Sequence, residues 1–210
     1  MRNIKLNFLN TLIIATLLFV GTYANANLIT SSNISTTGKF HHNVSLINDS
    51  IIPTELTRWS NSANVWWTGL TPTFTLDFGS LYTIDDVLLS VDNNDYYNIT
   101  WSNDLQSWTN LFNIVPSDGE VTVSMGGMDT MSTDFNHNDY IPALDFSSVQ
   151  ARYMRITATG GDNSYSIGEF QAFGSLAVNR QSTSVPEPST FAIFALGMIG
   201  LTSRRFKKQS

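Results

Sequence analysis

Residues 73–78 read TFTLDF, and this short stretch decides the fold class of the chain. Phe74, Leu76 and Phe78 alternate with Thr75 and Asp77. Successive side chains of a β-strand point to opposite faces, so the three apolar residues share one face of an extended segment. The stretch therefore predicts a strand that covers a core with one face only.

The same period of two recurs further along the chain, at Tyr97, Ile99, Trp101, Val121 and Val123. Turn-forming clusters separate these runs: DNND at 92–95, SND at 102–104, PSDG at 116–119 and GGDN at 160–163. No amphipathic helix of useful length appears between residues 27 and 174. Several short strands at this spacing predict a single all-β domain, a sandwich or a barrel.

The first 26 residues have the parts of a secretory signal peptide. Arg2 and Lys5 give a basic start, residues 6–20 are mostly apolar, and Ala24-Asn25-Ala26 fits a cleavage site for signal peptidase. We expect cleavage after Ala26. An uncleaved N-terminal anchor is the alternative.

Residues 185–208 read VPEPSTFAIFALGMIGLTSRRFKK. The uncharged run from Phe191 to Thr202 would reach about 18 Å as a helix, which is short of a hydrocarbon core of about 30 Å. It predicts a short, marginal membrane helix whose basic tail stays on the cytoplasmic side. A buried core helix is the alternative.

Pro186, Glu187 and Pro188, the apolar run and the Arg/Lys tail together resemble the PEP-CTERM sorting signal of Gram-negative bacteria. The resemblance implies a precursor held in the inner membrane until an exosortase processes it near the motif. The mature form would then reach the cell surface or the extracellular matrix. Membrane contact would belong to the precursor only.

The charge of the chain is unevenly distributed. Residues 27–185 contain sixteen Asp or Glu and five Lys or Arg, which leaves a net charge of −11. Such a surface repels polyanions, so nucleic-acid binding is excluded as a function. The chain has no cysteine, which excludes disulfides, thiol nucleophiles and cysteine-ligated metals.

Five segments resemble, in order, the discoidin or coagulation-factor type C domain, a galactose-binding-like fold. They are TRW at 57–59, FTLDFGS at 74–80 with Ile84 and Val87, YNITWSND at 97–104 with Trp108, ARYMRI at 151–156 and IGEFQAFG at 167–174. The resemblance implies a jelly-roll β-sandwich over residues 27–174, followed by a polar linker at 175–184. One departure is a longer, proline-containing connection before Trp59, where the family usually has Asp-Gly.

The same resemblance implies a structural calcium ion. Many discoidin-like domains hold calcium with an Asp, a nearby Thr, backbone carbonyls and a Glu in the final strand, which correspond here to Asp49, Thr57 and Glu169. Calcium prefers six to eight oxygen ligands of these kinds. Thr54 is the substitute for Thr57, and an ion pair of Glu169 with Arg152 or Arg155 is the alternative to a metal site.

A second calcium hypothesis concerns residues 134–139, DFNHND, which have the D-x-N-x-N start of a calcium loop. Asp145 stands where the bidentate Glu would be. However, Asp139 replaces the required Gly and Pro142 interrupts the loop. A polar surface loop is therefore the favoured interpretation.

Catalysis is not predicted, because the three histidines form no HExxH and no GxSxG, Walker or GxGxxG motif occurs. We predict a lectin-like module that binds neutral sugars of an extracellular polysaccharide. The candidate ligand-binding residues are Trp66, Trp67, Tyr96 and His137. A structural or adhesive matrix protein without a discrete ligand is the alternative.

Four other residues have structural interpretations. Trp101 and Trp108 flank a turn and are expected to pack as core or hairpin aromatics. Arg152 and Arg155 are expected to form ion pairs, with Asp85 or Asp86 as partners.

Overall fold

The computed structural model describes residues 26–121 and 126–177. The signal peptide up to Asn25, Val123, most of the predicted linker and the whole sorting motif, including Pro186, Glu187 and Pro188, lie outside these ranges. None of the helices within the described ranges has the length and apolar character needed to cross a membrane.

Strands make up about half of the described chain, and its other regular elements are two short 3₁₀ turns, which confirms the all-β prediction. In chain order the elements are β1 (Asn27–Ile29), β2 (Asn33–Thr37), η2 (Val44–Ile47), β3 (Val65–Thr68), β4 (Thr73–Asp92), β5 (Tyr96–Ser102), β6 (Thr109–Ile114), β7 (Met128–Ser132), η3 (Pro142–Leu144), β8 (Val149–Gly160) and β9 (Ser164–Leu176). Both η elements are single 3₁₀ turns.

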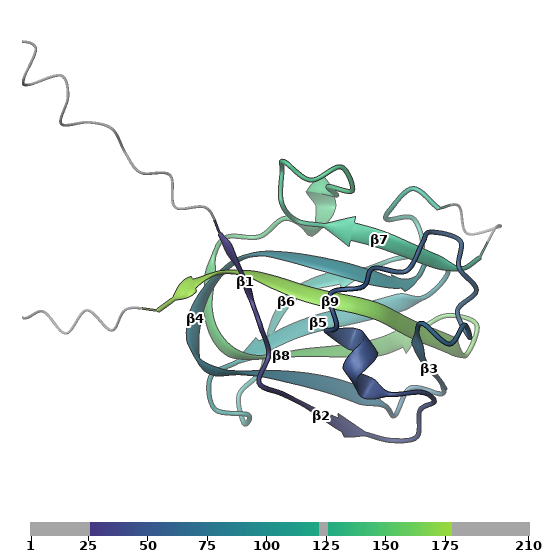
Figure 1. The fold of residues 1–210 in the computed structure, drawn as a ribbon, viewed down its shortest axis with the longest axis horizontal. Coiled ribbons are helices and arrows are strands. Elements are labelled where there is room, and N and C mark those ends of the chain that lie inside the picture. The colour runs from purple at the N-terminus through teal and green to yellow at the C-terminus, as the bar shows by residue number, and fades with distance from the viewer. Residues whose placement is uncertain (1–25, 122–125, 178–210) are drawn as a thin grey trace, which may run out of the picture. The chain divides into compact units, whose positions relative to one another are not determined.

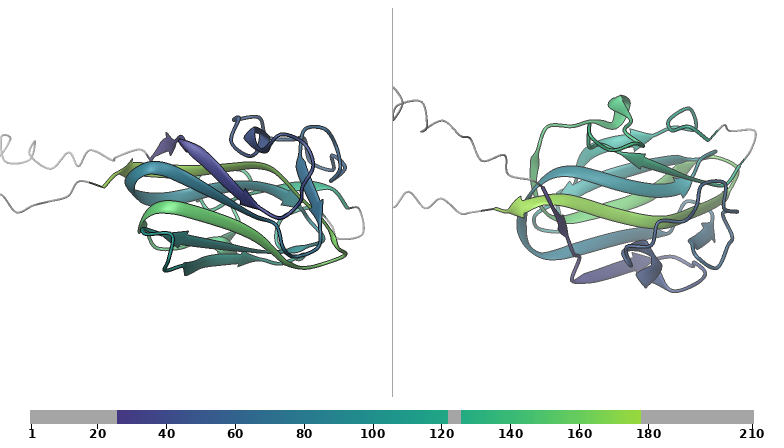
Figure 2. Two further views of the ribbon diagram at one scale, coloured as in Figure 1. Left: turned by 90° about the horizontal axis from the view of Figure 1, so that it is seen from below. Right: turned by 45° about the horizontal axis from the view of Figure 1, so that its top comes forward.

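The long strand β4 belongs to both layers of a sandwich (Figures 1 and 2). Its first part, from Thr73 to Asp77, pairs with β2 and β8, while the part from Tyr82 to Val91 pairs with β9. The last residues of β4 also pair with β7. Gly79, which has a φ of 75°, lies between the two parts where the register shifts. A residue without a Cβ adopts this left-handed conformation without strain.

The alternation at residues 73–78 has the predicted consequence. Phe74, Leu76 and Phe78 are all buried and belong to the main core cluster. Trp67 lies in the same cluster and is 0% exposed. Its ring packs against Phe74 and Tyr165, at centroid distances of 4.9 and 5.9 Å. Trp67 is therefore a core residue, and its prediction as a sugar-binding residue was wrong.

Two predicted ion pairs differ from those in the structure. Arg152 forms its ion pair with Asp77 (Nε to Oδ1, 3.0 Å) and not with Asp85 or Asp86. Arg155 donates to Thr75 Oγ1 and lies over the Trp108 ring at 3.6 Å from its centroid. The cause is register: Asp77 is the cross-strand partner of Tyr153, and Thr75 is the partner of Arg155 itself.

The domain boundary also needs a small correction. Ser175 and Leu176, which the sequence placed in the linker, belong to β9 and pair with Thr83 and Tyr82. The strand continues because β4 supplies backbone partners for β9 up to this point.

Trp101 is half-buried against the core, as expected for a hairpin aromatic.

Candidate functional site

A pocket of about 310 Å³ lies at one end of the sandwich, where β4, β8 and β9 have neighbouring ends. We call it the end pocket. It is lined by Leu56, Arg58, Trp59, Asp92, Asn94, Gly126, Gly127 and Asp162. Its volume falls within the range of about 300–1,000 Å³ that is usual for small-ligand sites.

Asp92 is the most deeply buried acid of the end pocket. It is the last residue of β4 and is 1% exposed. Its Oδ1 atom accepts a hydrogen bond from Gly127 N–H at 3.2 Å, whereas Oδ2 is buried and has no hydrogen-bond partner among the described residues. Burial, with a smaller contribution from the charge of Asp162, raises the pKa of Asp92 to about 7.

Asn94 and Asp162 bring the two turn clusters together. Asn94 Nδ2 donates to Asp162 Oδ2 at 3.1 Å, and Asp162 N–H donates to Asp95 Oδ1 at 3.1 Å. Asn94 Oδ1 is buried without a partner among the described residues. Burial also raises the pKa of Asp95, which is 0% exposed, to about 7. Among the residues that the structure describes, no donor satisfies Asp92 Oδ2 or Asn94 Oδ1 of the pocket.

Arg58 and Trp59 come from the loop before β3, and Asn64 fixes their backbone. Asn64 Nδ2 donates to both carbonyls at 3.1 Å, while the Asn64 carbonyl contacts a ring nitrogen of His42 at 2.8 Å. Trp59 is half-buried and packs edge-on against Trp66, with ring centroids 5.1 Å apart. The loop thereby places one aromatic and one cationic side chain in the end pocket.

The close approach of loop and pocket depends on Gly127, which has a φ of 114°. A Cβ at this position would lie 3.0 Å from the backbone carbonyl of Leu56 and from the carbonyl oxygen of Thr57. Gly127 also supplies the N–H that holds Asp92 and accepts from Asn93 N–H. A side chain at position 127 would push the backbone of Leu56 and Thr57 away from Gly127.

Of the predicted ligand-binding residues, none lines the end pocket itself. Trp66 adjoins it through Trp59 and stacks on His41, with centroids 3.7 Å apart. Tyr96 is 45% exposed at the start of β5. His137 lies in the loop after β7, beside Asp139. Asp92, Asn94 and Asp162 belong to turn clusters seen in the sequence, and Arg58 and Trp59 to its TRW segment. Leu56, Gly126 and Gly127 gave no sequence signal of a site.

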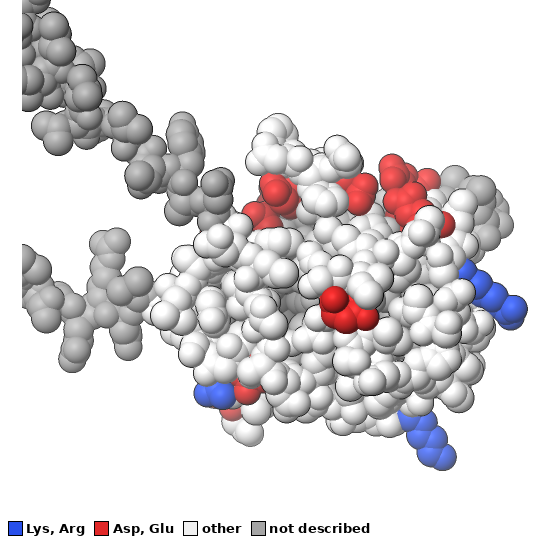
Figure 3. Space-filling model, viewed as in Figure 1, with Lys and Arg blue, Asp and Glu red and all other residues white. Residues whose placement is uncertain are grey.

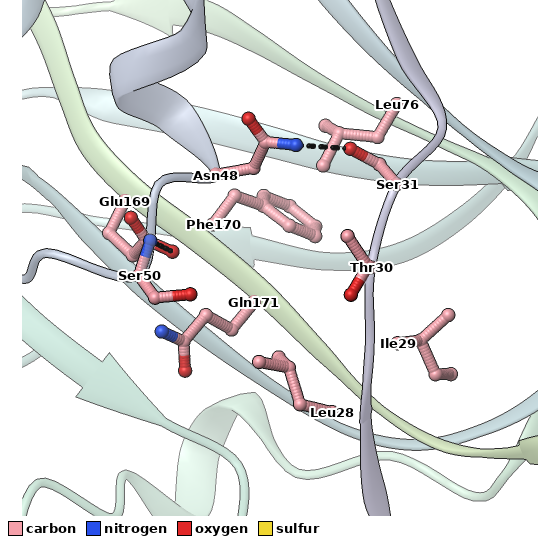
Figure 4. A pocket seen from close by; sticks show the side chains of 10 residues that line it. All are labelled: Leu28, Ile29, Thr30, Ser31, Asn48, Ser50, Leu76, Glu169, Phe170 and Gln171. Carbon is pink, nitrogen blue, oxygen red and sulfur yellow. Dashed lines mark hydrogen bonds between the residues drawn. The ribbon is translucent and has the colours of Figure 1, made fainter.

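A second, smaller site surrounds Glu169, as Figure 4 shows. It is a cavity of about 20 Å³ whose lining includes the oxygen-bearing residues Thr30, Ser31, Asn48, Ser50, Glu169 and Gln171. Glu169 is 1% exposed; its Oε1 accepts from Ser50 N–H at 3.3 Å, and its Oε2 has no partner among the described residues. Burial, and then the nearby Asp49 charge, raises the pKa of Glu169 to about 7.

The neighbourhood of Glu169 contains further unpaired oxygens. Ser90 is its cross-strand partner on β4, and Thr130 is the partner of Ser90 on β7. Both hydroxyl groups are buried without a hydrogen-bond partner among the described residues. Glu169 forms no ion pair with Arg152 or Arg155, so that alternative was wrong.

The predicted ligands are only partly brought together. The charge of Asp49 raises the pKa of Glu169, but Asp49 is exposed and does not line the cavity. Thr57 does not line the cavity; its carbonyl accepts from Met128 N–H at 2.8 Å, beside the edge of β7. Thr54 is exposed and is not a lining residue either. The proline-containing connection leads the chain away from Glu169 before Thr57 is reached.

Two other acidic groups lie outside these sites. Glu55, Glu120 and Asp139 have ligand atoms within 4.8 Å of one another; Glu120 is exposed and the other two are half-buried, and such surface acidic groups are common without an ion. In the loop at 134–139, Asp134 accepts from Asn136, and Asp145 accepts from the Tyr140 hydroxyl at 3.0 Å. Figure 3 shows acidic side chains gathered along the edge near β7.

Residues 184–208 match the PEP-CTERM protein-sorting motif, which confirms the resemblance drawn from the sequence. The match begins one residue before the predicted segment. This motif marks the chain for sorting through export. No curated protein sequence matches the chain.

Three solved structures are similar to this chain. A serum fucolectin from striped bass (Morone saxatilis) has a TM-score of 0.51 and 13% identity, over 72% of this chain and 50% of that one. A fucose binding module from Streptococcus pneumoniae has a TM-score of 0.49 and 9% identity, over 71% and 96%. Truncated AlyQ, with CBM32 and alginate lyase domains, has a TM-score of 0.45 and 18% identity, over 72% of this chain and 34% of that one. The domain has a discoidin-like β-sandwich fold.

Proposed function

We propose that the domain is a non-catalytic carbohydrate-binding module whose ligand occupies the end pocket. The observation that carries the proposal is the combination there of an aromatic face, Trp59, with the buried unpaired oxygens of Asp92 and Asn94. Sugars need both, because their C–H faces pack on aromatic rings and their hydroxyl groups donate to fixed acceptors. The fold shared with a fucolectin is consistent with this role.

The larger hollow beside β1 and the end of β9 is a weaker candidate. It has a volume of about 390 Å³ and is lined by residues such as Leu28, Tyr82 and Leu176. None of its lining residues carries a buried side-chain oxygen or nitrogen without a partner. It therefore lacks the unsatisfied groups that fix a polar ligand.

Replacing Trp59 with Ala is expected to weaken glycan binding at least tenfold, which corresponds to about 1.4 kcal/mol. The stacking face would be lost while the acceptors remain. The measurement is retention on a glycan array followed by titration calorimetry with the best ligand. A hydrolase screen on the same polysaccharides separates binding from turnover.

The matched control is Trp108→Ala, which removes an indole from the β5–β6 hairpin where it packs under Arg155. It should leave glycan affinity unchanged. Equal losses for both variants, or no specific glycan for the wild-type protein, would contradict the proposed site. The second result would favour a structural or adhesive matrix role.

We also propose that the module is displayed outside the cell after processing by an exosortase at the PEP-CTERM motif. Pro186, Glu187 and Pro188 would mark the processing region, and the apolar run would hold the precursor in the inner membrane. The intact mass of protein recovered from the cell surface checks this step. A mass that corresponds to cleavage near Pro188 is expected, whereas a surface protein that still ends at Ser210 would contradict it.

Finally, we propose that Glu169 and Asp49 hold a structural calcium ion. The fit rests on the buried Oε2 atom of Glu169, which lacks a donor, and on the neighbouring carboxylate of Asp49. A divalent cation would compensate both charges, and calcium accepts hydroxyl and carbonyl oxygens as further ligands. When bound, it would tie the loop after η2 to β9. Thr57 is not part of this proposed ligand set.

A further inference from the structure

The end pocket offers a ligand more acceptors than donors. Asp92 Oδ2 and Asn94 Oδ1 are buried without partners among the described residues, and Asp162 lines the same wall. Arg58 is the basic residue in the lining, but its side chain is exposed and forms no salt bridge with a described residue. A buried acceptor without a donor is costly, so the ligand that fits best brings donors of its own.

The electrostatics of this end of the sandwich favour a cation. The charge of Asp162 raises the pKa of Asp92, and the charges of Asp92 and Asp162 raise the pKa of Asp95, in each case in addition to the larger effect of burial. The segment from residue 27 to residue 185 carries a net charge of −11. A positive group placed beside Asp92 would relieve this repulsion, whereas a uronic acid would add to it.

An inorganic cation does not fit this arrangement as well as an organic one. Within the described residues, the group of three carboxylates with ligand atoms inside 4.8 Å is Glu55, Glu120 and Asp139, so the acids of the end pocket do not converge in that way. A pocket of about 310 Å³ is also far larger than a metal ion. Trp59 adds an aromatic face that a metal would not use but a sugar ring would.

Building on the proposed carbohydrate-binding function, we propose that the end pocket binds an amino sugar that carries a free ammonium group. The ammonium group donates to Asp92 Oδ2 and Asn94 Oδ1, and the ring packs on Trp59. An ammonium group has three donors and one positive charge, which match the two unpaired oxygens and the acidic surroundings. This ligand class differs from the neutral sugars predicted from the sequence.

The test compares three β-1,4-linked hexamers that differ only at carbon 2: glucosamine, N-acetylglucosamine and glucose. Titration calorimetry with the purified protein near neutral pH is expected to show at least tenfold tighter binding of the glucosamine hexamer. Asp92→Asn should remove this preference. The variant keeps an oxygen that can accept from Gly127 N–H but loses the charge.

The control is Asp104→Asn, which removes one negative charge from the exposed β5–β6 turn. Its affinity for the glucosamine hexamer should equal that of the wild-type protein. Equal losses in the two Asn variants would show attraction by overall charge and would overturn the inference. Equal or tighter binding of the N-acetyl or glucose hexamer would overturn it too, yet leave the proposed function standing. If none of the hexamers binds, the inference fails, and the glycan array with Trp59→Ala decides the proposed function separately.

Discussion

The domain is expected to melt about 5–10 °C higher in millimolar calcium than in EDTA. A ligand that binds only the folded state at a hundred times its Kd adds about 2.7 kcal/mol, and each kcal/mol raises the Tm of a domain of this size by roughly 2–4 °C. The proposed ion would compensate Glu169, whose Oε2 atom is buried without a partner among the described residues. Differential scanning calorimetry measures the shift.

Glu169→Gln should abolish the calcium-dependent shift and still fold. In EDTA at alkaline pH, it should melt at or above the wild-type Tm, because the buried charge has been removed. The matched control is Glu120→Gln in the other acidic group, which should keep the full shift. Loss of the calcium-dependent shift in Glu120→Gln, or a wild-type Tm that is the same in calcium and in EDTA, would contradict the site at Glu169.

The fold could be predicted because its signal is local. Alternation at Phe74, Leu76 and Phe78 is a property of neighbouring residues, and the structure buries all three. The pair Trp66 and Trp67 shows the limit of such a signal. Alternation implies that neighbours in a strand face opposite ways, but only the pairing of β3 with β9 determines that Trp67 enters the core.

The end pocket could not be predicted because it depends on pairing between distant segments. Asn94 and Asp162 were visible only as members of two turn clusters, which suit turns for purely local reasons. Their contact follows from the pairing of β4 with β9 and of β5 with β8, which brings the two turns to one end. Glu169 and Asp49 are also far apart in the sequence, and only the family resemblance, not a local pattern, predicted them as a pair. Thr57 does not line the cavity, because the connection before it is longer here.

In EDTA, the free energy of unfolding is expected to fall as pH rises from about 5 to about 8. The folded-state pKa values of Asp92, Asp95 and Glu169 are raised to about 7, above the unfolded values near 4. The folded state therefore holds protons that the unfolded chain has already released. This contribution is fully present below about pH 4 and is lost as pH rises through about 7.

The size of the effect follows from about 1.4 kcal/mol per unit of pKa shift. Each of the three carboxyl groups would lose about 2.6 kcal/mol between pH 5 and pH 8, so the total loss is at most about 8 kcal/mol. Asp92 and Asp95 interact, so they titrate as a pair. Asp77 has the opposite sign, because its hydrogen bond to Arg152 lowers its pKa. Its stabilisation is lost only in more acidic solution and does not cancel the fall between pH 5 and pH 8. Urea unfolding across this range measures the slope.

Asp92→Asn should reduce the slope, whereas Asp104→Asn at an exposed turn should not. A wild-type profile that is flat, or that rises with pH, would contradict the assignment of buried protons to these carboxyl groups.

The same protons connect stability to binding. If an ammonium group of the ligand occupies the place beside Asp92, it must displace the proton held there, so binding below about pH 7 should release protons to the buffer. Calorimetry of the glucosamine hexamer in two buffers with different ionisation enthalpies would detect this release, and a neutral sugar bound through hydroxyl groups would produce a smaller one.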